Sequence, residues 1–197
     1  VTHWIDYQLW PRMPSLMHLH NLLWYLGICF LLLKLYRRTL PTAPVALIAL
    51  ALYGLDATHG FAISWIANRN GLIAAFFGMA AFLTYIRWRE DQGSHWQGLS
   101  LLLLLAALLS AEIGISTFGY LAAYAWCCDP KGRAKGILAL LPHAGVIIVW
   151  YAVYKLAGFG ADPGRTASIS ATIFSVSRLA VPLPIAISAT PYWRISC

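Results

Sequence analysis

Few polar residues in this chain could do chemistry, and the first pair of them is Asp56 and His59. A carboxylate three residues before an imidazole lies on the same face of a helix, where the two groups can share a proton. In a chain this apolar, ionisable groups are costly and are often functional, so the pair is a candidate substrate site. The alternative is that both side chains lie at the membrane interface, where water solvates them.

Arg69, with Trp65 four residues before it, is the second candidate. At helical spacing the indole can stack on the guanidinium, and a guanidinium can also hold an anion through two parallel hydrogen bonds. The alternative is structural, because tryptophan is enriched at membrane interfaces and a boundary arginine anchors a span in the headgroups. The sequence leaves both interpretations open.

Glu112 interrupts an otherwise unbroken apolar stretch. It is either a carboxylate in a cavity near the outer membrane face or a residue at the tip of a helical hairpin, where it caps the next helix.

His18 and His20 do not share a helical face, so we expect neither a metal site nor a cofactor. Cys127 and Cys128 are adjacent and form no CxxC motif, so we expect no disulfide framework.

The composition is that of a membrane protein. Hydrophobic residues make up 60% of the 197 positions, and the mean hydropathy is +0.67. The run 99–109 is apolar all the way round, which excludes an ordinary amphipathic helix. The net charge of +7 comes from short basic clusters between apolar runs and not from one stripe, so we expect the lipid bilayer, and not nucleic acid, as the partner.

The apolar runs predict an all-α, polytopic transmembrane helix bundle that forms a single domain over residues 1–197. We expect five spans and a possible sixth. A single helix over 96–128 would measure roughly 48 Å against a hydrocarbon core of about 30 Å, so we divide this run into two short helices with a break near Glu112 and Gly114. The expected spans are 16–36, 40–55, 71–88, 96–110 with 114–128, and 137–156, and the possible sixth is 171–189.

The basic clusters predict the orientation. With two helices in 96–128, the basic residues 34–38, 87–89 and 131–135 all fall on one face, which the positive-inside rule makes cytoplasmic. We therefore expect an integral protein of a bacterial inner membrane. The chain starts without a methionine and stops just after an aromatic stretch, so we expect a fragment of a longer protein.

An ordered set of motifs resembles the membrane region of GT-C type glycosyltransferases. The set is His-Leu-His-Asn at 18–21, Trp-Ile-Ala-Asn-Arg-Asn-Gly at 65–71, and Leu-Leu-Ser-Ala-Glu at 108–112. The likeness is to relatives of the protein O-mannosyltransferases and to the membrane region of transmembrane proteins that carry tetratricopeptide repeats. It implies transfer of a sugar from a polyprenyl-phosphate donor at the outer face, with His59, Arg69 and Glu112 lining the donor cavity.

The chain also departs from that family. Where the family reads His-Pro-x-His-x-Glu, this chain has Asp56, Ala57, His59 and Phe61, and the family's Ser-Lys-Glu is Ser-Ala-Glu at 110–112. The family's catalytic acid would lie upstream of Val1, so no catalytic residue is assigned. Two other classes therefore stay open: a membrane scaffold that has lost the chemistry, and a small transporter, which would show an internal symmetry that is not evident here.

Overall fold

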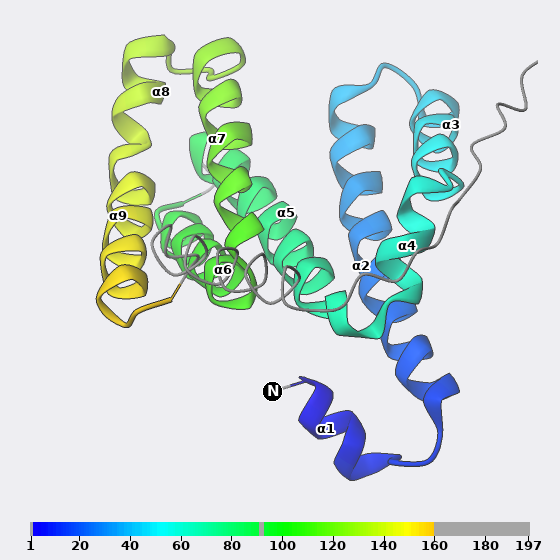
Figure 1. The fold of residues 1–197 in the computed structure, drawn as a ribbon. Helices are drawn as coiled ribbons and strands as arrows, with labels where there is room; N and C mark the ends of the chain where they lie inside the picture. Colours follow the sequence, from blue (N-terminus) through cyan, green and yellow to red (C-terminus); the bar gives the residue numbers. More distant parts are fainter. Residues whose placement is uncertain (1, 91–92, 160–197) are drawn as a thin grey trace, which may run out of the picture. The chain divides into compact units, whose positions relative to one another are not determined.

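A computed structural model describes residues 2–90 and 93–159, and these residues form helices and turns without a strand. The all-α fold class is therefore confirmed. The elements are α1 (Thr2–Leu9), α2 (Pro14–Thr39), α3 (Ala43–Gly54), α4 (Thr58–Ser64), the 3-10 turn η1 (Ile66–Asn68), α5 (Arg69–Arg89), α6 (His95–Ser110), the 3-10 turn η2 (Glu112–Ile115), α7 (Ser116–Cys127), α8 (Arg133–Ala139) and α9 (Leu141–Leu156) (Figure 1).

Fewer helices are able to cross a membrane than the sequence predicted. Among the described residues, three helical stretches are long and apolar enough: α2, η1 with α5, and α8 with α9. Helices α3 and α4 form a fourth if a pair bent by 58° counts as one span. The prediction of five spans and a possible sixth was wrong in number, and residues 171–189 lie outside the described part.

The overestimate arose in the apolar run 96–128. Helix α6 has 16 residues and α7 has 12, so at 1.5 Å per residue they rise about 24 Å and about 18 Å, less than the hydrocarbon core. The run does break at η2, in the segment for which the sequence predicted an interruption. A Cβ at Gly114 would lie 2.7 Å from the backbone of Ala107, so only glycine lets this turn fold back against α6.

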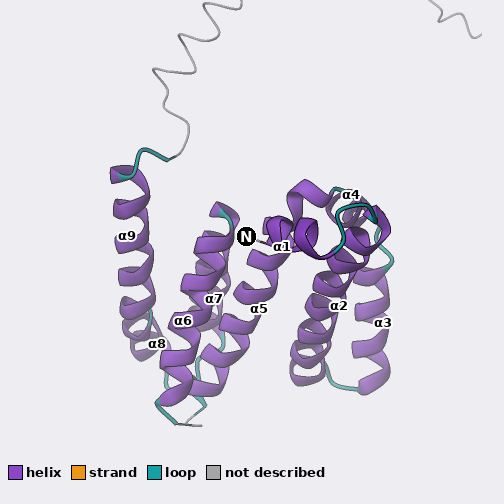
Figure 2. Cartoon of the chain, turned by 90° about the horizontal axis from the view of Figure 1, so that it is seen from below, coloured by secondary structure: helices purple, strands orange, loops and turns teal. Residues whose placement is uncertain are grey.

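Helix α5 is the centre of the packing. It lies between the α2–α3 pair and the α6–α7 pair, as Figures 1 and 2 both show, and it packs most extensively on α6 and then on α2 and α7. Ten of its residues are buried, among them Ala74, Gly78 and Ala81, and small side chains of this kind allow close helix approach in a membrane. The described residues 154–159 belong to a second unit, in which the rings of Tyr154 and Phe159 lie 5.7 Å apart.

Buried polar contacts join the helices. The Ser100 hydroxyl of α6 donates to the carbonyl of Ala81 in α5 and lies 3.0 Å from Nε2 of the buried His143 in α9. At the other end of α5, the guanidinium of Arg89 makes two hydrogen bonds, of 2.7 and 3.0 Å, to Asp129 after α7. These contacts fix α6, α7 and α9 against α5.

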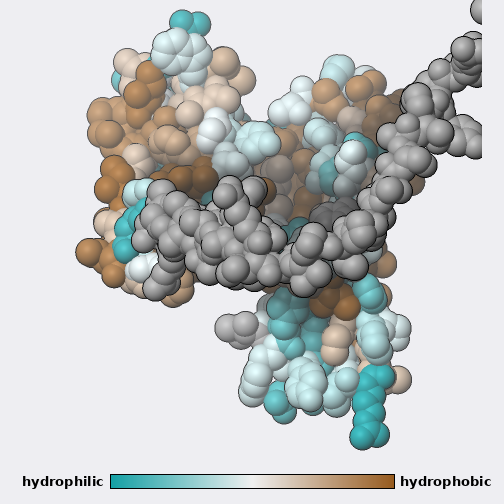
Figure 3. All heavy atoms as spheres, in the orientation of Figure 1, coloured by the Kyte–Doolittle hydropathy of each residue, from teal (hydrophilic) through white to brown (hydrophobic). Residues whose placement is uncertain are grey.

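The outer surface of the helices is apolar. Leu22, Leu26 and Phe30 of α2 and Ile148 and Val149 of α9 are large side chains that are at least 40% exposed. In Figure 3 hydrophobic residues cover the helices, whereas hydrophilic residues gather over α1 and the start of α2. Exposed apolar surface on this scale is what lipid tails require, so the fold fits a membrane protein.

Candidate functional site

Arg69 is the first residue of α5, and its side chain is fully buried. The guanidinium forms an ion pair with Asp6 of α1, donates to the side-chain oxygen of Asn21 in α2, and donates to the carbonyl of Met17 at 2.9 Å. A buried cation is tolerated only when it is paired and hydrogen-bonded. Arg69 therefore links α1 to the N-terminal ends of α2 and α5.

Asp6 binds Arg69 with one carboxylate oxygen and His20 with the other. The Oδ1 atom lies 2.8 Å from His20 Nδ1, and since an ionised carboxylate only accepts, Nδ1 donates to it. Burial alone would raise the pKa of Asp6, but hydrogen bonds from His20 and Arg69 outweigh it and hold the pKa below its usual value. The result is a buried carboxylate that orients a partly exposed imidazole.

Asp56 lies in the turn before α4 and not on a continuous helix with His59, so the helical spacing assumed for the pair does not hold. The role of the pair as a substrate site stays a prediction. Asp56 is exposed and precedes α4, where its side chain accepts from the backbone N–H of Thr58 at 2.9 Å and so caps the helix. His59 lies in α4, with its ring 4.3 Å from the ring of Tyr53 and 5.7 Å from that of Tyr25. The chain turns between the two residues, which the spacing argument did not allow for.

Trp65 and Glu112 also lie outside regular α-helix. Trp65 is 52% exposed and precedes the 3-10 turn η1, so the helical spacing assumed for Trp65 and Arg69 does not hold. Glu112 is exposed and begins η2, the turn between α6 and α7. Its position is that of the hairpin tip, which was one of the two interpretations of this residue.

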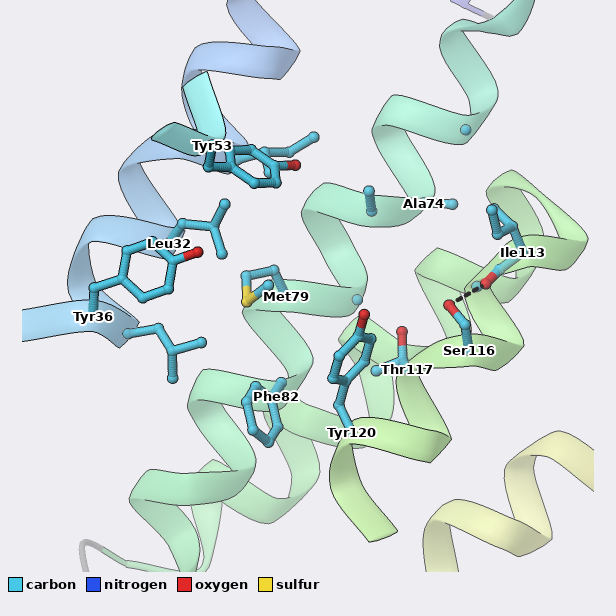
Figure 4. A pocket seen from close by; sticks show the side chains of 16 residues that line it. Leu32, Tyr36, Tyr53, Ala74, Met79, Phe82, Ile113, Ser116, Thr117 and Tyr120 are labelled. Carbon is cyan, nitrogen blue, oxygen red and sulfur yellow. Dashed lines mark hydrogen bonds between the residues drawn. The ribbon is translucent and has the colours of Figure 1, made fainter. Parts of the chain in front are cut away.

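An apolar cavity of about 440 Å³ lies between α2 and α3 on one side and α5, η2 and α7 on the other. Apolar side chains such as Leu32, Met79 and Phe82 form most of its wall (Figure 4). Three rings from three helices, those of Tyr36, Tyr53 and Tyr120, line it too. A cavity of this size and lining fits a hydrocarbon chain with a few hydrogen-bonding positions along its length.

None of the five predicted site residues lines this cavity, but several adjoin residues that do. Gly71 of the wall follows Arg69 by two residues, Ile113 directly follows Glu112, and the Tyr53 ring is in contact with His59. Arg69, Asp6, His20 and Asn21, hereafter the polar cluster, lie where α2 and α5 begin. The wall of the cavity starts further along the same two helices, at Gly71 on α5 and at Ile28 on α2.

The polar cluster can hold an anion and can move a proton. The guanidinium could bind phosphate oxygens if Asp6 were displaced, and a neutral His20 could accept a proton at Nε2 while Asp6 holds Nδ1. Asn21 does not contribute to such a site, because its amide N–H donates to the carbonyl of Ile63 and its oxygen accepts from Arg69. Within the part of the chain that the structure describes, no three metal-ligating side chains come together.

The sequence analysis missed Asp6 and the helix that carries it. Asp6 is the sole carboxylate in the first 55 residues, and this isolation within an aromatic stretch was the available signal. Its partner Arg69 is 63 positions away, a separation that no local spacing rule reaches.

Two curated proteins resemble this chain. They are the human and the mouse protein O-mannosyl-transferase TMTC3, each 28% identical over 127 residues, which is 63% of this chain and only 14% of either relative. No protein-family model matches the chain, and no solved structure matches it. At the level of the family, the likeness and the apolar helices fit a glycosyltransferase-like membrane protein. Both relatives are mammalian, so they lend no support to the expected bacterial inner membrane.

Proposed function

We propose that this chain is the lipid-substrate-binding part of a multi-pass membrane glycosyltransferase that uses a polyprenyl-phosphate-linked sugar at the outer membrane face. In this proposal the basic ends of α2 and α5 face the cytoplasm, and the polar cluster faces outward. The basic residues 34–38 and 87–89 at those two ends support this orientation by the positive-inside rule. The named activity of the human and mouse relatives, O-mannosyl transfer, supports the reaction class.

The observation that carries the proposal is that a charged cluster and an apolar cavity lie along the same two helices, with Gly71 of the cavity wall two residues after Arg69. A polyprenyl phosphate is an amphiphile with a long hydrocarbon chain and one anionic end. The cavity of about 440 Å³ would receive the first isoprene units, and the polar cluster would receive the phosphate. Neither half of the site alone would select for such a donor.

Binding requires an exchange of anions on Arg69. In the free protein Asp6 neutralises the guanidinium, while Asn21 and the Met17 carbonyl hold it in place. A donor phosphate would replace the carboxylate, and helix α1 would move with Asp6. Because a guanidinium presents two parallel N–H groups and an ammonium does not, lysine cannot reproduce this contact.

The test is binding of a polyprenyl phosphate to the purified protein. Asp6→Asn removes the competing anion, so we expect it to bind more tightly than wild type. Arg69→Lys should bind much more weakly, and the double variant Asp6→Asn with Arg69→Gln should stay folded, because both buried charges are gone, and should not bind. Arg12→Gln, which removes an exposed cation just after α1, is the matched control and should bind as wild type does. Equal binding by wild type and the double variant would refute the proposal.

A second candidate, a non-catalytic scaffold, is favoured by one observation. Arg69 already has a protein partner for each of its hydrogen-bonding nitrogens, Nε, Nη1 and Nη2, as a purely structural arginine would. A scaffold predicts that Asp6→Asn lowers stability without raising affinity for polyprenyl phosphate. It also predicts no transfer of labelled sugar from a polyprenyl-phosphate donor by membranes that contain the full-length protein.

A further inference from the structure

We infer that the basic end of α2 and α5 is a binding site for the phosphate headgroup of an anionic phospholipid. Four cationic side chains line one hollow of about 330 Å³ there: Lys34, Arg37 and Arg38 of α2 and Arg87 of α5, with Leu83 between them. This site lies at the opposite end of α2 and α5 from the polar cluster, and the inference does not depend on the proposed function.

Within the described ranges 2–90 and 93–159, the charges of this hollow are only partly balanced. Arg38 forms an ion pair with Glu90 just after α5, so among the described residues here four cations face one paired carboxylate, a net charge of +3. Arg89 nearby is excluded from the hollow because Asp129 holds it. An excess of positive charge at a helix end attracts the anionic lipids of the adjoining leaflet.

Two of the cations are held in place by aromatic rings. The Arg87 guanidinium lies 4.7 Å from the ring centroid of Trp96, and the Lys34 ammonium lies 4.4 Å from that of Phe30. A cation over a ring keeps its N–H groups available at the edge, so both can still donate to phosphate oxygens. The site is therefore partly preorganised.

The surface beside the hollow distinguishes a lipid from a free phosphate. Leu26, Phe30 and Lys34 follow one another at four-residue spacing on α2, and the two apolar members are 53% and 56% exposed. An acyl chain can run along Leu26 and Phe30 while its phosphate reaches Lys34. A soluble phosphate would leave this apolar row unused, so the geometry points to a lipid.

The experiment is native mass spectrometry of the full chain in detergent, titrated with phosphatidylglycerol. We expect one saturable lipid, with phosphatidylcholine binding far more weakly. Each charge is worth about five-fold in affinity, so Arg87→Gln should lose about five-fold and Arg37→Gln with Arg87→Gln about 25-fold. Lys135→Gln, which removes an exposed cation of α8 instead, should bind as wild type does.

Two additional measurements separate charge from fold and a lipid from a free phosphate. Arg37→Lys keeps the charge and should keep binding within about two-fold, whereas a loss of fold would abolish binding by this variant too. Glycerol phosphate, which lacks acyl chains, should not displace the lipid at millimolar concentration. Displacement by glycerol phosphate, equal binding of both lipids, or full binding by the double variant would each overturn the inference.

Discussion

Replacing Asp129 by alanine should destabilise the protein far more than replacing Glu90 by alanine. Both carboxylates pair with an arginine, but their surroundings differ. The side chains of Arg89 and Asp129 are 7% and 1% exposed, whereas those of Arg38 and Glu90 are 30% and 35% exposed. The comparison therefore tests burial and not merely the presence of an ion pair.

The magnitude follows from what each variant leaves behind. Asp129→Ala leaves the buried Arg89 guanidinium without its two hydrogen bonds to Asp129, which should lower the free energy of unfolding by about 3 to 5 kcal/mol. It also removes the acceptor for the backbone N–H of Lys131. Glu90→Ala removes a solvent-exposed pair that is worth about 0 to 1 kcal/mol. Replacing both members of the buried pair, with Arg89→Met and Asp129→Leu, should restore most of the loss, since no unpaired charge is left.

The assay is equilibrium unfolding of the purified protein in mixed micelles, followed by tryptophan fluorescence. Burial alone would raise the pKa of Asp129, but the hydrogen bonds from Arg89 and from the Lys131 backbone, together with the positive charges of both residues, outweigh it and lower the pKa. Stability from this pair is therefore complete above the usual carboxyl pKa and is lost as the pH falls through the lowered value. The difference in unfolding free energy between wild type and Asp129→Ala should shrink in that acidic window. If Asp129→Ala and Glu90→Ala cost the same at neutral pH, the pair is not buried as described.

Three more predictions follow from the packing. Gly78→Val should cost about 1 to 3 kcal/mol, because a Cβ would meet the Thr117 hydroxyl, and Thr117→Ala should recover part of that loss. Ser100→Ala should cost about 1 to 3 kcal/mol in the same assay, because it leaves His143 Nε2 buried without its partner. Since the Asp6 pKa is lowered, α1 should detach only in acid, and protease cleavage before residue 14 that is as fast at neutral pH as at pH 3 would contradict this.

The sequence predicted the helical class, but not the number of spans or the local geometry around the candidate site residues. Long apolar runs identify helices because periodicity and composition are local properties, and the turn at 111–115 was readable from the glycine and the carboxylate within the run. The number of spans was overestimated because an apolar run does not state where helices begin and end. Helix α6 ends at Ser110, so its length is shorter than the thickness of the hydrocarbon core.

The site residues show why spacing was not enough. The prediction for Asp56 and His59 assumed one continuous helix, but the chain turns before Thr58, and Asp56 caps the helix that His59 belongs to. Arg69 was singled out as a candidate, but its burial depends on Asp6, a partner on a helix that had not been predicted. A contact between residues this far apart in the chain produces no periodic pattern in a single sequence.

The long separation of Asp6 and Arg69 also sets an order of events during synthesis. Asp6 and His20 are 14 positions apart, so their hydrogen bond can form as soon as the first turns of α2 have emerged from the ribosome. Arg69 follows 63 positions after Asp6, so it is synthesised after both α1 and α2 are complete. The nascent α5 thus meets an anion that is already in place, and its charged first residue is neutralised on arrival. A chain shortened by ten residues at its beginning would have to insert the same arginine with no counter-ion to receive it.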